Sequence, residues 1–310
     1  PARAPAGPVA SPRPPSSADS RSRKNDRRDA ERLARLALAG EVSPVWVPPE
    51  QAGGLRELAQ AMDDLACVRE AARQRVNAIL CRHGISWDER TPTGRLKKRW
   101  GQHFWDWLRS IDLGDAGSQA AYLAALSAAE SAEVACDELR ARAEGIARAS
   151  DLGPPVDALM CVKGVGFSSA LAFAAEVGDF SRFASGRKVT SYFGLAPSES
   201  SSAESRRLGR ISRNGCALVR KLLIEGAWVL ARGNPACRKR GGASVPLAIR
   251  EHARACSGRL LGRRRELVSR GLMPCKANTA TAAEMARMLL HVGRDAQEAA
   301  ALAAEVALVA

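Results

Sequence analysis

The chain has 310 residues, enough for one to three domains with a buried core. Lysine and arginine outnumber aspartate and glutamate by 47 to 33, which gives a formal charge of +14. This excess favours a polyanionic partner, nucleic acid above all. No apolar run is long enough to cross a bilayer, and the dispersed cysteines and histidines predict neither a disulfide framework nor a metal cluster.

Residues 1–23 are rich in proline, serine, alanine and arginine, and we expect them to be disordered. A helix is predicted over 24–36, with Asp26 and Asp29 three residues apart on one face. Two carboxylates at this spacing suit Mg²⁺, although acids in a first helical turn are also favoured by the helix dipole. The proline-interrupted segment 42–47 then predicts a short edge strand.

Two long helices are predicted next, over 50–84 and 118–149. In the second, apolar residues recur every seven positions, which indicates a narrow coiled-coil seam suited to a close helix pair or to dimerisation. The seam consists of Ala125, Ala132, Leu139 and Ile146, with Ala129, Cys136 and Ala143 four residues after the first three. Residues 86–113, between them, hold four of the six tryptophans among lysines and arginines. That segment is either a clamp for single-stranded nucleic acid or a tryptophan-anchored packing unit.

The segment 151–155 breaks the helical pattern and marks a boundary. Lys163 then precedes a Gly-Val-Gly turn that leads into an alanine-rich helix, as in helix-hairpin-helix DNA-binding modules. Glycines at 164 and 166 let the backbone approach a phosphate, and the helix start offers N–H donors. The alternative is an ordinary tight turn.

Residues 195–215 place clustered hydroxyls directly before a basic run. The hydroxyls are those of Ser198, Ser200, Ser201, Ser202 and Ser205. The basic residues are Arg206, Arg207, Arg210 and Arg213. A serine oxygen attacks phosphorus only where the phosphate is held and neutralised, and arginine does both. The competing interpretation is a solvated serine-rich loop before a charged helix start.

The C-terminal third predicts an amphipathic helix after Gly215, a basic region over 232–270 and an alanine-rich helix over 280–308. The first of these has Arg220 and Lys221 on its polar face, and its apolar face consists of Leu218, Leu222, Leu223, Ala227 and Leu230.

Three blocks of the chain, residues 24–35, 162–183 and 192–215, resemble transposases of the insertion-sequence 110/116/902 family, also called DEDD transposases. The resemblance implies a mainly α fold with a remnant of a RuvC/RNase-H-like α/β domain, a long helical coiled-coil segment, and a helical C-terminal transposase domain with a helix-hairpin-helix-like entry. The expected segments are 1–23 (disordered), 24–90 (RuvC-like remnant and long helix), 91–150 (tryptophan segment and coiled coil), 151–240 (transposase domain) and 241–310 (basic helical end).

The family cuts and rejoins DNA through a serine nucleophile and a metal-binding set of Asp, Glu, Asp and Asp, guided by a structured RNA. By position, Ser202 matches the nucleophile, with Ser201 as the alternative, although Ala203 stands where the family usually has glycine. Asp26 and Asp29 match the last two acids and would bind Mg²⁺. The expected nucleic-acid contacts are Lys163, Gly164, Gly166, Arg206, Arg207, Arg210 and Arg213.

The first Asp and the Glu of that set have no counterpart in 1–23, so we expect a truncated or frameshifted copy that is inactive alone. The alternative is a non-catalytic DNA- or RNA-binding fragment, and a third interpretation is a helical scaffold that multimerises through 118–149. The expected partners are the element ends and target DNA, a structured guide RNA and further copies in a dimer or tetramer, in the bacterial cytoplasm at the nucleoid and away from membranes.

Overall fold

The computed structural model describes residues 26–41, 46–202, 205–232 and 244–309. The chain divides into two compact units, residues 1–50 and 51–310. The first contains the predicted helix, α1 (Asp26–Leu38). Most of the predicted edge strand lies outside the described residues, and Trp46 and Val47 at its end are not in a strand.

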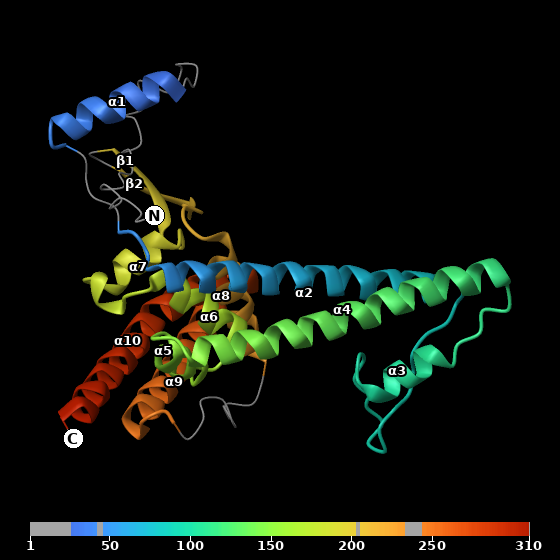
Figure 1. Cartoon of the computed structure of the whole chain (residues 1–310). Helices are drawn as coiled ribbons and strands as arrows, with labels where there is room; N and C mark the ends of the chain where they lie inside the picture. The colour runs from blue at the N-terminus through green and yellow to red at the C-terminus, as the bar shows by residue number, and fades with distance from the viewer. Residues whose placement is uncertain (1–25, 42–45, 203–204, 233–243, 310) are drawn as a thin grey trace, which may run out of the picture. The chain divides into compact units, whose positions relative to one another are not determined.

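The second unit is mainly helical, as predicted, and contains one two-stranded sheet among its described residues (Figure 1). Its long helices are α2 (Glu50–Arg82), α4 (Ala116–Arg148), α9 (Leu247–Ser269) and α10 (Pro274–Val309). The shorter elements are α3 (Gln102–Arg109), α5 (Gly153–Met160), α6 (Phe167–Val177), η1 (Phe180–Arg182), α7 (Gly186–Tyr192), β1 (Pro197–Ser202), β2 (Ser205–Ile211) and α8 (Ala217–Ala231). In the described part of the chain no helix is long and apolar enough to span a membrane.

Helices α2 and α4 run alongside each other, joined by the ion pairs of Arg69 and Arg73 with Glu133 (Figure 1). Part of the predicted seam of α4 is buried, including alanines 129, 132 and 143. Its last position is wrong, because Ile146 is 53% exposed and the neighbouring Ala147 is 1% exposed in its place. A straight helix has 3.6 residues per turn, so a seven-residue repeat drifts around it over several turns.

The tryptophan segment packs against the second half of α2 and the first half of α4. Trp87 is 5% exposed, and its ring centroid lies 5.1 Å from that of Phe104 and 5.0 Å from that of Trp107. Tyr122 of α4 is buried beneath them and donates a hydrogen bond to the Leu108 carbonyl at 2.7 Å. The structure therefore supports the packing interpretation of this segment, which we call the tryptophan lobe (residues 86–113).

The larger core lies in the C-terminal half, where α10 packs against α5, α7, α8 and α9. The predicted helix after Gly215 is α8, and it buries Leu218, Leu223 and Leu230 as its pattern predicted. The last helix begins at Pro274, six residues before its predicted start at residue 280.

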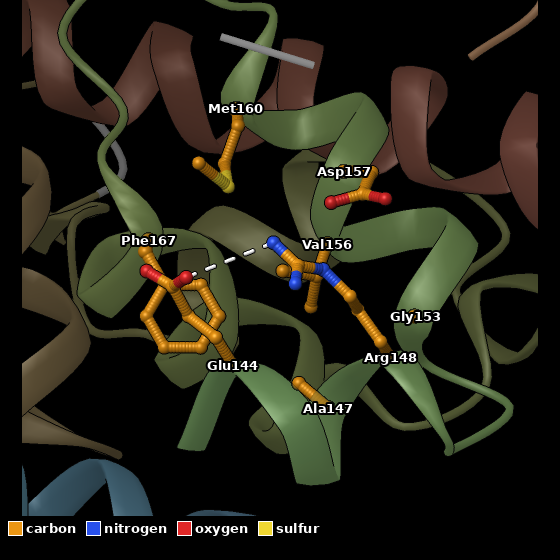
Figure 2. A pocket seen from close by; sticks show the side chains of 8 residues that line it. All are labelled: Glu144, Ala147, Arg148, Gly153, Val156, Asp157, Met160 and Phe167. Carbon is orange, nitrogen blue, oxygen red and sulfur yellow. Dashed lines mark ion pairs between the residues drawn. The ribbon is translucent and has the colours of Figure 1, made fainter. Parts of the chain in front are cut away.

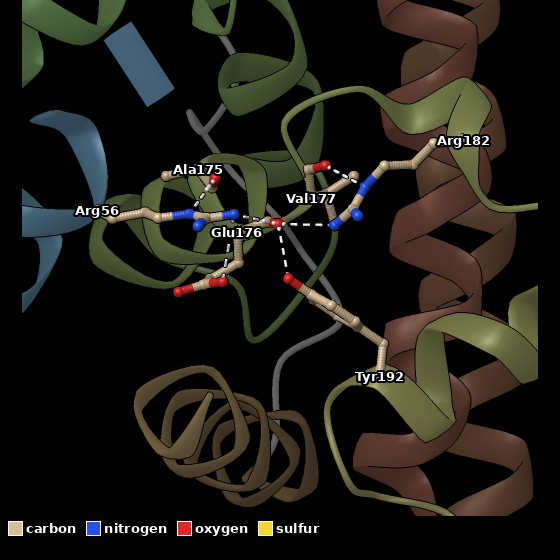
Figure 3. A network of polar contacts seen from close by, with 6 residues as sticks. All are labelled: Arg56, Ala175, Glu176, Val177, Arg182 and Tyr192. Carbon is tan, nitrogen blue, oxygen red and sulfur yellow. Dashed lines mark hydrogen bonds and ion pairs between the residues drawn. The ribbon is translucent and has the colours of Figure 1, made fainter. Parts of the chain in front are cut away.

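Polar contacts at the end of α6 fasten α2 to this core (Figure 3). Arg56 of α2 donates to the carbonyls of Ala175 and Glu176, each at 2.9 Å. Arg182 donates to the Val177 carbonyl at 2.8 Å and to that of Glu176 at 3.1 Å. The last carbonyls of a helix have no partner within it, and two cations therefore stabilise this end of α6.

Candidate functional site

The predicted serine–arginine stretch is a β-hairpin formed by β1 and β2, and two glycines close its base. Gly194 and Gly215 both have positive φ, +64° and +71°. A Cβ at Gly194 would overlap the Asn214 backbone, and one at Gly215 would overlap the Tyr192 carbonyl oxygen. The two chain segments cross here, and only glycine fits both the backbone conformation and the close approach.

Arg220, on the first turn of α8, holds the same base together. Its Nη1 lies within hydrogen-bond distance of the carbonyls of Phe193 (3.1 Å), Asn214 (2.6 Å), Gly215 (3.1 Å) and Cys216 (3.3 Å). The guanidinium thus joins Phe193, four residues ahead of β1, to the residues that follow β2. Sequence analysis missed this role, because the helical pattern indicated only that Arg220 lies off the apolar face.

The hairpin has a bulge near its base, between Pro197 and Glu199. Ser198 lies opposite the extra residue that β2 has there, and its hydroxyl donates to the Arg210 carbonyl at 3.0 Å. A Cβ at Gly209 would overlap that hydroxyl. Bulges of this kind increase the local twist and bend the bulged strand. Ser198 therefore has a structural role and is distinct from the serines farther along the strand.

The register places the predicted nucleophiles at the outer end of the hairpin. Ser201 pairs with Arg206 and Ser202 pairs with Ser205. Residues 203 and 204, which join the strands, lie outside the described residues, as do the side chains of 199–208. Because strand residues alternate between faces, positions 202 and 207 share one face of the hairpin and positions 201 and 206 share the other. The backbone thus brings both candidate serines into one short ribbon with two of the predicted arginines.

The other two predicted arginines have described side chains. Arg210 lies on β2 and Arg213 lies just beyond it, and both are exposed. Neither has an ion-pair partner among the described residues. Arg213 has φ of +59°, unusual for a residue with a side chain, and its N–H donates to the Gly194 carbonyl at 3.0 Å. Uncompensated arginines suit phosphate contacts.

The Gly-Val-Gly turn connects α5 to α6. Gly164 has φ of +91°, and its backbone is so close to Gly226 of α8 that a Cβ on either would overlap the other's carbonyl oxygen. Gly166 has open space around it and caps α6 without a side-chain hydrogen bond. Lys163 is half-buried, and its N–H donates to Ser257 Oγ at 2.9 Å. Packing alone thus explains Gly164, while Gly166 has no internal contact that requires glycine.

Asp26 and Asp29 lie in the first turn of α1, in the other compact unit. Their spacing places both positions on one helix face, and carboxylate oxygens are suitable ligands for a divalent cation. Among the described residues no group of three or more His, Cys, Asp or Glu side chains gathers to hold a metal ion. Two carboxylates fit such an ion in type but not in number, so these two residues would need further oxygen ligands to bind it.

A small cavity of about 50 Å³ lies where α4, α5 and α6 meet (Figure 2). Glu144, Arg148 and Asp157 line its polar side, and Arg148 forms an ion pair with Glu144 at 3.7 Å. Burial raises the pKa of Asp157, with Arg148 opposing the rise and Glu144 adding to it. None of the predicted site residues lines this cavity, although its apolar wall includes Phe167, which directly follows Gly166.

Comparison with known protein families gives matches to two separate parts of the chain. Residues 156–241, which include α6, the hairpin and α8, match the family described as "Transposase IS116/IS110/IS902 family". Residues 8–84 match a second family described as "Transposase".

Two relatives align over most of the chain. The y4qE protein of Sinorhizobium fredii, named as a putative transposase, is 34% identical over 278 residues, which are 89% of this chain and 66% of the relative. The transposase for insertion sequence element IS1111A of Coxiella burnetii is 26% identical over 213 residues, 68% of this chain and 56% of the relative. The chain thus spans about two thirds or less of these relatives' own lengths.

Proposed function

Because the chain belongs to the IS116/IS110/IS902 family of transposases, we propose that it acts in DNA transposition, as a recombinase that cuts and rejoins the DNA of an insertion sequence. The observation that carries this proposal is the hairpin of β1 and β2. It combines two candidate nucleophiles, Ser201 and Ser202, with the arginines of β2, on a base that Arg220 and two glycines make rigid.

The proposed reaction is an exchange of esters. The Ser202 oxygen attacks the phosphorus of a DNA phosphodiester, a bond from phosphorus to a DNA oxygen breaks, and the proton of the serine hydroxyl ends on the leaving DNA hydroxyl. In rejoining, a DNA hydroxyl attacks the phosphoserine and releases Ser202. One phosphate ester replaces another at each step, so no nucleoside triphosphate is needed.

The arginines would bind the phosphate and stabilise the charge that develops on its oxygens. Arg206 and Arg207 flank the serines in the register, and Arg210 and Arg213 lie nearer the base. Preorganised donors aimed at developing charge contribute most to such reactions, and arginine offers two parallel N–H groups to phosphate. A rigid base would keep these donors in place without reorganisation.

The proposal includes a divalent metal ion, Mg²⁺, which Asp26 and Asp29 would hold with further oxygen ligands and which would supply charge stabilisation for phosphoryl transfer. A structured guide RNA is the proposed selector of donor and target DNA, and the active species is proposed to be a dimer or tetramer. Helix α1 would in this account be part of a RuvC-like domain, and α5 with α6 would be a helix-hairpin-helix-like DNA contact through Lys163 and Gly166.

A second candidate function is non-catalytic binding of DNA or RNA. The observation that favours it is the formal charge of +14, together with exposed arginines such as Arg210 and Arg213 that have no ion-pair partner among the described residues. Such a basic surface binds a polyanion whether or not strand exchange takes place.

Covalent adducts separate the two candidates. Labelled element-end DNA is incubated with the chain, its guide RNA and Mg²⁺, and adducts are resolved on a denaturing gel. We expect an adduct that Ser202→Ala abolishes, whereas Ser191→Ala, which changes an exposed serine of α7, retains it. Salt-sensitive binding without any adduct would favour the binding fragment, and an adduct unaffected by Ser202→Ala and by Ser201→Ala would contradict the proposed nucleophile.

A further inference from the structure

Helix α9 presents a row of exposed arginines. It buries Ile249, Ala253, Cys256 and Leu260 against the core. Arg250, Arg254 and Arg265 are exposed and have neither an ion pair nor a hydrogen bond through their side chains in the described part of the chain. Four and eleven residues separate them, so at 100° per residue they lie within about 60° of helix circumference. We call these three the α9 arginine row.

The arginine row adjoins the Gly-Val-Gly turn. Ser257, one turn after Arg254, accepts a hydrogen bond from the Lys163 N–H at 2.9 Å and donates one to the Ala253 carbonyl at 2.8 Å. Ser257 therefore positions the turn that holds Lys163 and Gly166 against the side of α9 on which Arg254 lies. The Ser257 hydroxyl thus brings the Lys163 turn and the α9 arginine row, which are far apart in the sequence, next to each other on one surface.

The same outer side of α9 has two glycines that no packing explains. Gly258 and Gly262 are exposed, and nothing lies within 4 Å of a Cβ built on either. Glycine inside a helix costs about 1 kcal/mol relative to alanine. Without side chains here, a polyanion could come close to the helix between the arginines.

The chemistry of this surface fits a duplex rather than a single strand. The sequence of α9 has no aromatic residue apart from His252, so it offers no tryptophan, tyrosine or phenylalanine on which unpaired bases could stack. Arg250 and Arg265 are fifteen helical steps apart, or about 22 Å along a straight helix. That length matches several successive phosphates of a double helix, and arginine binds phosphate without reading the base sequence.

We propose that the α9 arginine row, with the Lys163 turn that Ser257 positions beside it, binds the phosphate backbone of double-stranded DNA. The choice of DNA rests on the proposed function. The surface is separate in sequence from the hairpin, and its role is to anchor the duplex, not to take part in the ester exchange.

The test is a binding measurement that does not depend on cleavage. The triple variant Arg250→Gln, Arg254→Gln, Arg265→Gln is compared with Arg140→Gln, Arg142→Gln, Arg148→Gln, which removes three exposed arginines from α4. Fluorescence anisotropy with a labelled 30-base-pair DNA gives the affinity across a range of salt concentrations. We expect the α9 variant to lose affinity about tenfold or more, with the slope of log K against log salt less steep by about 2 to 3.

Equal affinities and slopes in the two triple variants would overturn the proposal. A loss confined to a duplex RNA of the same length would overturn the assignment to DNA.

A second variant, Gly258→Gln with Gly262→Gln, is expected to raise the melting temperature, because both positions gain helix propensity, and yet to weaken DNA binding several-fold. Unchanged DNA binding in that variant would contradict a close approach between the arginines. Adduct formation at Ser202 is measured separately, so failure of the recombinase proposal is distinguishable from failure of this one.

Discussion

The tryptophan lobe and the hairpin of β1 and β2 look alike in sequence, because each interleaves basic residues with a distinctive residue type. In the lobe Trp87 is buried at 5% exposure, and the other three tryptophans are half-buried and pack against the same core. In the hairpin the residues that pack are the inconspicuous ones, Gly194, Gly215 and Arg220, and all of them lie at its base. The lobe therefore uses its distinctive side chains for packing, whereas the base of the hairpin is held by glycines and one arginine.

The largest effect is expected at the hairpin base. Gly215→Val forces a branched side chain into positive φ and against the Tyr192 carbonyl, and we expect a loss of about 4 kcal/mol or more in the free energy of unfolding. Urea unfolding measures it. The matched control is Gly145→Ala in α4, where nothing lies within 4 Å of a Cβ and a gain of about 1 kcal/mol is expected. A tolerated Gly215→Val would contradict the close packing assigned to the hairpin base.

Removing the central tryptophan of the lobe is next in size. Trp87→Ala deletes a ring packed between Phe104 and Trp107, together with its N–H bond to the Lys97 carbonyl at 3.2 Å. We expect a loss of about 3 kcal/mol, seen as faster hydrogen exchange in α3, with DNA affinity unchanged. Trp228→Ala, at a residue 39% exposed, should cost much less. Reduced DNA affinity without loss of stability would instead make the lobe a nucleic-acid clamp.

Arg220→Ala is expected to cost about 2 kcal/mol, because the hydrogen bonds of a charged donor to several carbonyls are lost together. Adduct yield should fall as well, since the hairpin would lose its fixed orientation. Arg187→Ala, which removes an exposed arginine of α7, serves as control. Full adduct yield in a destabilised Arg220→Ala chain would show that the base does not position the hairpin.

The smallest effect concerns the cavity between α4, α5 and α6. Burial raises the folded-state pKa of Asp157, so the folded chain retains this proton more tightly than the unfolded chain. Stability therefore decreases as pH rises above the ordinary aspartate value of 3.8. Asp157→Asn should be more stable than the parent at pH 7, with the difference shrinking toward pH 4. Urea unfolding of the variant and the parent across this pH range measures the difference, and a less stable Asp157→Asn at pH 7 would reverse the assigned cause.

The helices were predictable because their apolar residues repeat at helical spacing over many turns, as in α2 and α8. The hairpin was not. Its first strand, from Pro197 to Ser202, is built of residues with low strand propensity, and its pairing depends on contacts made at the base. Gly194 and Gly215 contact each other's neighbours across about twenty residues of sequence, and no local pattern reveals such a crossing.

The candidate site was predictable only as a set of residue types. Serines beside arginines indicated phosphate chemistry, and the register of Ser201 with Arg206 joined them in one ribbon. The structural role of Ser198 and the arginine row of α9 needed three-dimensional contacts. Sequence alone could show neither the hydroxyl that bonds the Arg210 carbonyl nor the hydrogen bond that seats Lys163 on Ser257.

The most direct measurement is to identify the amino acid that becomes attached to DNA. The chain is incubated with element-end DNA, guide RNA and Mg²⁺, digested with nuclease and protease, and analysed by mass spectrometry for a nucleotide-bearing phosphoserine. The account predicts the modification at Ser202, or at Ser201 one position away on the same strand end. Modification of a serine outside the hairpin, or none while the chain remains bound to DNA, would contradict it.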